Sequence, residues 1–124
     1  MAKSTFRISH RPDNILVISV EDVSEETVQH WFEYSMADMM GYTGPTRILY
    51  DMRRLNSLSM NAVRKAIRLR RHPNIHLAYV AVLTTSTAVK ALVNVALSVN
   101  AGGRFATFTD EEKAVKWLHI QVPD

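Results

Sequence analysis

Leu77-Ala78-Tyr79-Val80-Ala81-Val82-Leu83 is a nearly continuous apolar run, typical of a central strand that is covered on both faces of its sheet. The sequence Thr84-Thr85-Ser86-Thr87 follows this run and supplies N-cap residues for a helix. We predict that this helix covers residues 87–99 and that Gly102-Gly103 ends it. A buried strand that leads directly into a helix indicates a parallel α/β sheet.

The predicted helix over residues 87–99 is apolar around most of its circumference. Only Lys90, Asn94 and Ser98 interrupt it, and their four-residue spacing places them in one narrow stripe. The remaining arc is wider than the ~100° that covers one side of a core. We therefore expect a second cover on this helix, either another copy of the chain in a homodimer or a bound apolar partner. The predicted dimer interface consists of Val89, Val93 and Ala96.

Working outward from this helix, the other elements follow from periodicity and capping signals. We predict strands over residues 6–9, 15–20, 47–51, 76–83 and 105–108. We predict further helices from Ser24 to Gly41, from Ser57 or Ser59 to about residue 71, and from a Thr109–Glu112 capping box onward. The fold class is α/β with the order β-β-α-β-α-β-α-β-α. We expect a mostly parallel central sheet with helices packed on it, in a single domain over residues 1–124.

Composition limits the classes of function. The chain has 124 residues, is 47% hydrophobic and contains no cysteine, which excludes disulfides, thiolate zinc sites and cysteine nucleophiles. No uncharged apolar run is long enough for a membrane span, and the N-terminus lacks the apolar region of a signal peptide. We therefore expect a cytoplasmic protein.

Positive charge is concentrated between Asp51 and His72, where Asp51 is the only acid. We consider an anion-binding role for Arg53, Arg54, Arg64, Arg68 and Arg71. The alternative is a solvated helix face on a slightly basic protein. Nucleic acid is not the expected partner, because the segment lacks aromatic residues that stack on bases and the chain has no reader motif.

Two segments resemble a known family. They are Ile48-Leu49-Tyr50-Asp51-Met52-Arg53-Arg54-Leu55 and Phe108-Thr109-Asp110-Glu111-Glu112-Lys113-Ala114-Val115-Lys116-Trp117-Leu118. Together with the order of elements, they resemble the STAS superfamily and most of all its small bacterial SpoIIAA-like proteins. The resemblance covers most of the chain from about Arg47 onward and implies a regulatory, protein-binding domain.

Anti-sigma-factor antagonists of this superfamily carry Asp-Ser-Ser/Thr-Gly at the start of the helix that follows the aspartate-ended strand, and a partner kinase phosphorylates a serine there. The corresponding stretch here is Ser57-Leu58-Ser59-Met60-Asn61, which lacks the Asp-Ser pair and the glycine. The preferred interpretation of Ser57 and Ser59 is that they are N-cap residues of the following helix. The resemblance makes them candidate phosphoacceptors, because phosphate is favoured near a helix N-terminus.

The sequence contains no recognisable catalytic motif. Asp51 ends a strand, where ligands of open α/β sheets tend to bind, but it can equally bond loop amides or pair with Arg53 or Arg54. The five histidines lack the spacing of a helical metal site, so we predict no metal and no cofactor. The adjacent Trp31 and Phe32 cannot both be buried on one helix face, so one of them is expected to reach a pocket or a partner.

These observations favour a non-enzymatic regulatory or protein-interaction module of the STAS type. The alternative is a carrier or sensor of a lipid or other small apolar ligand, which the wide apolar helix favours. Its pocket could be lined by Met36, Met39, Met40 and Met60, although their helical spacing favours core positions. An enzyme that uses Asp51 with a nearby Arg or His is the third hypothesis.

Overall fold

The computed structural model describes residues 6–98 and 104–124, which form one sheet with the strand order β1-β2-β3-β4-β5. Its elements are β1 (Phe6–Arg11), β2 (Ile15–Val20), α1 (Glu25–Met40), β3 (Thr46–Asp51), α2 (Met60–Leu69), the 3₁₀ helix η1 (Ile75–Leu77), β4 (Ala78–Leu83), α3 (Thr87–Ser98), β5 (Arg104–Phe108) and α4 (Glu111–Gln121). β1 pairs with β2 in antiparallel orientation, and all other pairs are parallel. The predicted fold class and element order are confirmed. Residues 1–5 and the predicted helix stop at Gly102-Gly103 lie outside the described residues.

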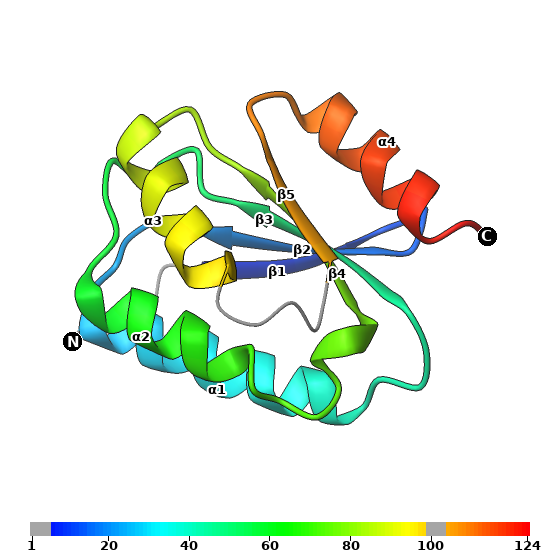
Figure 1. Cartoon of the computed structure of the whole chain (residues 1–124), viewed down its shortest axis with the longest axis horizontal. Coiled ribbons are helices and arrows are strands. Elements are labelled where there is room, and N and C mark those ends of the chain that lie inside the picture. Colours follow the sequence, from blue (N-terminus) through cyan, green and yellow to red (C-terminus); the bar gives the residue numbers. More distant parts are fainter. Residues whose placement is uncertain (1–5, 99–103) are drawn as a thin grey trace.

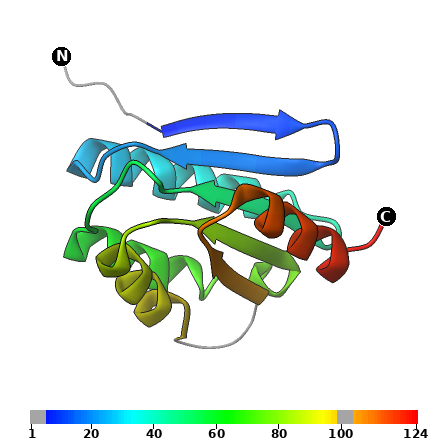
Figure 2. The same ribbon diagram turned by 90° about the horizontal axis from the view of Figure 1, so that it is seen from above.

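The helices cover the two faces of the sheet unequally (Figures 1 and 2). α4 packs on β3, β4 and β5 from one side, while α1, α2 and α3 follow one another on the opposite side. Among the described helices, none combines the length and the hydrophobicity needed to cross a bilayer.

Local signals in the sequence explain most element boundaries. Ser24 is the N-cap of α1, where its Oγ accepts a hydrogen bond from the Thr27 amide at 3.2 Å, and Gly41 is the C-cap. The turn between β1 and β2 ends at Asn14, whose φ of 62° is a left-handed conformation that asparagine tolerates. The limits of the first helix therefore follow from the residues predicted to set them, whereas β1 runs two residues past its predicted end.

Further boundaries also differ from the prediction. The N-cap of α4 is Asp110 rather than Thr109, because the Asp110 carboxylate accepts a hydrogen bond from the Glu112 amide at 3.1 Å. α2 ends at Leu69, and the chain then turns at Pro73, which cannot continue a helix. The predicted strand over residues 76–83 begins only at Ala78, since η1 occupies the residues before it.

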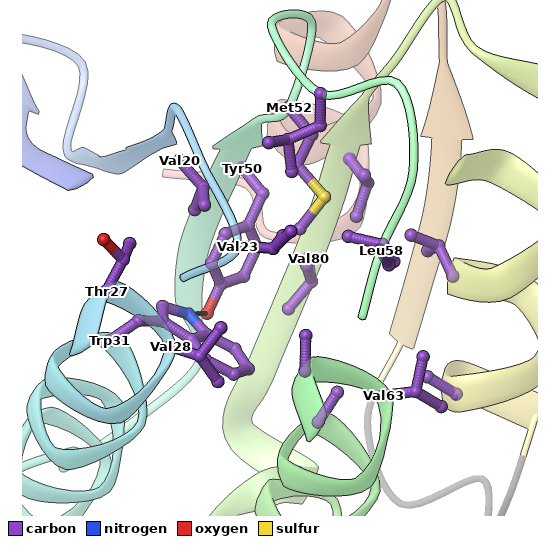
Figure 3. Close-up of a pocket in the computed structure, with 16 residues that line it drawn as sticks. Val20, Val23, Thr27, Val28, Trp31, Tyr50, Met52, Leu58, Val63 and Val80 are labelled. Atoms are coloured by element: carbon purple, nitrogen blue, oxygen red, sulfur yellow. Dashed lines mark hydrogen bonds between the residues drawn. The ribbon is translucent and has the colours of Figure 1, made fainter. Parts of the chain in front are cut away.

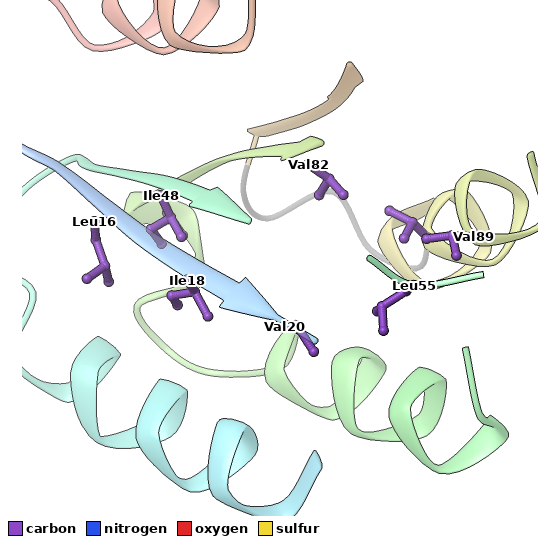
Figure 4. Packing of buried hydrophobic residues seen from close by; sticks show 9 residues of the cluster. Leu16, Ile18, Val20, Ile48, Leu55, Val82 and Val89 are labelled. Carbon is purple, nitrogen blue, oxygen red and sulfur yellow. The ribbon is translucent and has the colours of Figure 1, made fainter. Parts of the chain in front are cut away.

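Buried side chains form one core on each face of the sheet. Leu16, Ile18, Ile48 and Val82 face the three-helix side together with side chains from α3 (Figure 4). Ile15, Leu49, Ala81 and Leu83 face α4, where they meet Ala114 and Leu118. Alternation along each strand thus supplies both cores, as expected for a sheet covered on both faces.

The predicted dimer interface is wrong in its residues. Val89, Val93 and Ala96 are 0%, 5% and 3% exposed, and the two valines belong to the core on the three-helix side. The second cover that the sequence requires is α2, which packs along α3. These three side chains are therefore part of the interior of a single chain, and the homodimer stays a prediction without them.

Candidate functional site

Asp51 ends β3 and is held by its own loop. Its carboxylate accepts hydrogen bonds from the Arg53 amide at 3.1 Å and from the Arg53 guanidinium at 2.8 and 3.0 Å. The hydrogen bonds from Arg53 hold the pKa of Asp51 below its usual range. A carboxylate in this state is a poor general base at neutral pH. The geometry thus favours the structural role for Asp51, although a small polar pocket lies beside it.

The five arginines considered for anion binding do not form one site. Arg53 pairs with Asp51 and with Glu111 at 3.1 Å, and Arg54 pairs with Glu21 at 3.1 Å. The remaining three, Arg64, Arg68 and Arg71, are exposed on α2 and just beyond its end. The predicted set is therefore divided into two neutralised loop arginines and a group on a helix surface.

We define the α2 basic face as Arg64, Lys65, Arg68 and Arg71. Within the described parts of the chain, none of the four forms an ion pair with an acid. Lys65 and Arg68 instead lie over the Phe32 ring of α1, at 4.8 and 5.8 Å from its centre. This stacking holds two cations at the surface without neutralising them.

Ser57 and Ser59 lie in the connection that leads from β3 into α2. Ser59 is the N-cap of α2, and its Oγ accepts a hydrogen bond from the Ala62 amide at 3.1 Å. Ser57 is exposed two residues earlier. The cap expected at Ser57 or Ser59 is therefore made by Ser59, and the Ser57 hydroxyl stays at the surface.

An apolar cavity of about 90 Å³, the first cavity, lies between the sheet and the three helices on its side. Figure 3 shows Val28 and Trp31 of α1, Tyr50 of β3 and Val63 of α2 around it. Trp31 donates from its indole Nε1 to the Tyr50 hydroxyl at 3.1 Å, with the two rings edge to face. The sequence predicted that either Trp31 or Phe32 would reach a pocket or a partner, and in the structure Trp31 lines this cavity.

A second cavity of about 80 Å³ adjoins the first and shares Trp31, Tyr50, Ala66 and Val80 with it. Its polar lining residues are Ser35, Asp38, Tyr42, Tyr50 and Arg70. Burial raises the pKa of the Tyr42 phenol, and its 2.8 Å hydrogen bond to Asp38 adds to the effect. Burial also raises the pKa of Tyr50, so both phenols are neutral at physiological pH.

Ser35 was not among the residues predicted for any site. It lies one helical turn after Trp31 on the buried side of α1 and is 6% exposed. Of the methionines considered for an apolar pocket, only Met39 lines a cavity, while Met40 and Met60 are exposed at the surface. Within residues 6–98 and 104–124, no three histidine or acidic side chains gather as a metal site would need.

Comparison with solved structures defines the class of fold. A point variant of RsbS from Moorella thermoacetica superposes with a TM-score of 0.72 at 18% identity, over 98% of this chain and 100% of that one. A STAS-domain anti-sigma-factor antagonist of Planctomyces limnophilus gives a TM-score of 0.63 at 16% identity, over 90% and 96% of the two chains. The fold is therefore that of STAS domains.

The sequence narrows this class to a family. The SpoIIAA-like family model matches residues 15–119, so the chain belongs to the SpoIIAA-like family. An uncharacterised Shewanella loihica protein with a SpoIIAA-like fold, from the DUF3478 family, has a TM-score of 0.65 at 20% identity, over 92% of each chain. No curated protein sequence matches this chain significantly.

Proposed function

We propose that this chain is a non-enzymatic regulatory module that binds an acidic protein surface through the α2 basic face. The observation that carries the proposal is that Arg64, Lys65, Arg68 and Arg71 lie at the surface of α2 and just beyond its end without an acidic partner in the described chain. The name of one similar structure, an anti-sigma-factor antagonist, also points to regulation through protein contacts.

Repulsion between the positive charges along α2 favours binding of an acidic partner. The helix contains no acid, and Arg64 and Arg68 are four residues apart. Like charges at this spacing destabilise a helix by about 0.2–0.5 kcal/mol per pair, and a partner's carboxylates would remove that cost. Met60 precedes Arg64 by one turn and is 60% exposed, so it adds an apolar contact at the end of the same stripe.

A photo-crosslinking amino acid at position 60 tests this proposal in cells of the chain's own organism. Ile120 of α4 is the matched control position, because it is 65% exposed on the opposite side of the sheet. We expect a discrete protein adduct from position 60 and none from position 120. Adducts of equal yield at both positions, or no adduct at position 60 in the folded protein, would contradict a partner at the α2 basic face.

Ser57 is the better candidate for phosphorylation within this proposal. Its side chain is exposed, whereas the Ser59 hydroxyl is engaged with the Ala62 amide. A phosphate at either serine would lie near the positive end of α2. Mass spectrometry of protein isolated from its own cells, with Ser57→Ala and Ser59→Ala compared, is expected to place any added phosphate on Ser57.

Carriage of a small apolar ligand is the second candidate function, and the two adjoining cavities favour it. Ala66 lines both cavities, so Ala66→Leu should fill part of each. Native mass spectrometry of freshly purified protein is expected to show a bound small molecule that Ala66→Leu loses. Repeated spectra of the parent protein without an adduct would count against this candidate.

A further inference from the structure

We propose that a pocket at the carboxyl ends of β4 and β5 binds a small phosphate monoester, whose phosphate group is held by Lys90 and Lys113. We call it the β4–β5 pocket. Its volume is about 240 Å³, and its lining consists of Thr84, Lys90, Thr107, Phe108, Thr109 and Lys113. The pocket shares no residue with the α2 basic face or with the two apolar cavities, so this site goes beyond both functions proposed above.

The connectivity of the sheet explains why a pocket lies at this position. β4 and β5 are parallel neighbours, and Leu83 pairs with Phe108 at their carboxyl ends. The chain leaves β4 toward α3 on the three-helix side, whereas it leaves β5 toward α4 on the opposite side (Figure 1). In open α/β sheets, ligands bind outside the carboxyl ends of the strands, in the crevice where such connections diverge. The position of the pocket therefore favours a binding site.

The charge of the lining selects an anion. Lys90 comes from α3 and Lys113 from α4, and no acidic residue belongs to the lining. Neither lysine forms an ion pair with an acid of the described chain. Two like charges that line one pocket repel each other, and an anion bound between them would replace this repulsion by attraction.

The acids at the start of α4 do not oppose an anion within the pocket. Asp110 is the N-cap, and its carboxylate accepts the Glu112 amide at 3.1 Å. Glu111 pairs with Arg11 at 3.3 Å and with Arg53 at 3.1 Å. None of these three acids lines the pocket, so the two lysines supply the charged groups that a ligand there would meet.

The neutral part of the lining narrows the kind of anion. Thr107 and Thr109 add hydroxyl groups, which can donate to phosphate oxygens, and Phe108 adds an apolar surface for the carbon atoms of an ester. A phosphate monoester carries a charge of about −1.5 to −2 at pH 7, which matches two lysines better than the single charge of a carboxylate. The volume is below the roughly 300–1,000 Å³ of pockets for drug-sized ligands, so the ester group is small.

Three probes test the site: n-propyl phosphate, inorganic phosphate, and butyrate, which joins the same propyl group to a carboxylate. Binding to the full chain is followed by NMR of the backbone amides, at constant ionic strength in a phosphate-free buffer. The variants are Lys90→Gln and Lys113→Gln. Lys116→Gln is the matched control, because Lys116 is exposed on α4 and does not line the pocket.

We expect n-propyl phosphate to shift the amides around Thr84 and Phe108 and to bind more tightly than the other two probes. Each pocket variant should weaken its binding about 5- to 10-fold, as for one lost charge-assisted hydrogen bond, and Lys116→Gln should leave it unchanged.

Three results would overturn the proposal. Equal weakening in Lys116→Gln, or shifts centred on the α2 basic face, would mean general attraction to positive surface. Butyrate that binds as tightly as n-propyl phosphate would exclude phosphate as the selected group, and inorganic phosphate that binds as tightly would exclude the ester. Absence of shifts at the pocket would contradict the site itself, while the crosslinking test at position 60 would be unaffected.

Discussion

At the scale of single residues, two serines of α1 have opposite roles in stability. The Ser24 hydroxyl caps the helix, while the Ser35 hydroxyl is buried without a partner in the described chain. We expect Ser24→Ala to lower the free energy of unfolding by about 1 kcal/mol. Ser35→Ala should raise it by about 0.5–1 kcal/mol, because alanine removes the unsatisfied group and is the better helix former. Urea unfolding of ligand-free protein measures both, and a loss of stability in Ser35→Ala would show that its hydroxyl is satisfied.

Asp13 gives the chain a pH dependence. Hydrogen bonds from Arg11 and His119, both at 2.9 Å, lower the pKa of its carboxyl from 3.8 to about 2. Because the folded pKa lies below the unfolded value, the carboxylate stabilises the fold above about pH 4, and this contribution fades as the pH falls toward about 2. The stability difference between parent and Asp13→Asn should narrow over that interval in urea titrations. A difference that stays constant with pH would contradict the assignment.

The sequence predicts some of these residues better than others. One of Trp31 and Phe32 was expected to reach a pocket or a partner, because two adjacent aromatic residues cannot both be buried on one face of a helix, and Trp31 lines the first cavity. Ser35 carries no such signal, since a serine in a helix usually bonds the backbone or faces water. It lines the second cavity together with Tyr50, which is fifteen positions away in another element, and no local pattern in the sequence predicts that the two residues come together.

At the scale of elements, α3 shows what hydrophobic periodicity can and cannot predict about the packing of a helix. The width of its apolar arc correctly indicated two covers, and the sheet is one of them. The other cover is α2, whereas the prediction assigned it to a second copy of the chain. Sequence periodicity gives the amount of surface to be buried but not the element that buries it, because that depends on contacts between distant segments.

A pair of substitutions on α3 tests this assignment. Val93→Glu would place a charge at a position that is 5% exposed, and we expect a loss of about 3 kcal/mol or more in the free energy of unfolding. Ala91→Glu on the exposed side of the same helix should change stability by less than about 0.5 kcal/mol. Chemical unfolding of both variants measures the difference. A stable, folded Val93→Glu protein would mean that the helix packs differently.

At the scale of the whole molecule, the order of elements was predictable because most boundaries carry a local signal, such as a β-branched strand, a serine cap or a Gly or Pro stop. The right-handed crossover rule then limits how parallel strands can follow one another. The two cavities were not predictable, since they are formed by side chains from helices, strands and connections that meet only in the folded chain.

The homodimer is a prediction about the whole molecule that needs a direct mass measurement. Light scattering at low micromolar concentration is expected to give twice the chain mass of 14.1 kDa. Since Val89, Val93 and Ala96 are interior, such a dimer must use another surface. A measured mass of one chain at every concentration tested would contradict the homodimer.

The central claim is that the α2 basic face is the surface through which this SpoIIAA-like domain meets an acidic partner. The most direct test is the yield of the position-60 crosslink in Arg64→Glu/Arg68→Glu, compared with Lys113→Glu/Lys116→Glu, which changes the same charge on exposed positions of α4. We predict that the first variant loses the adduct while folding normally and that the second keeps it. An adduct that survives charge reversal on α2 at full yield would contradict the claim.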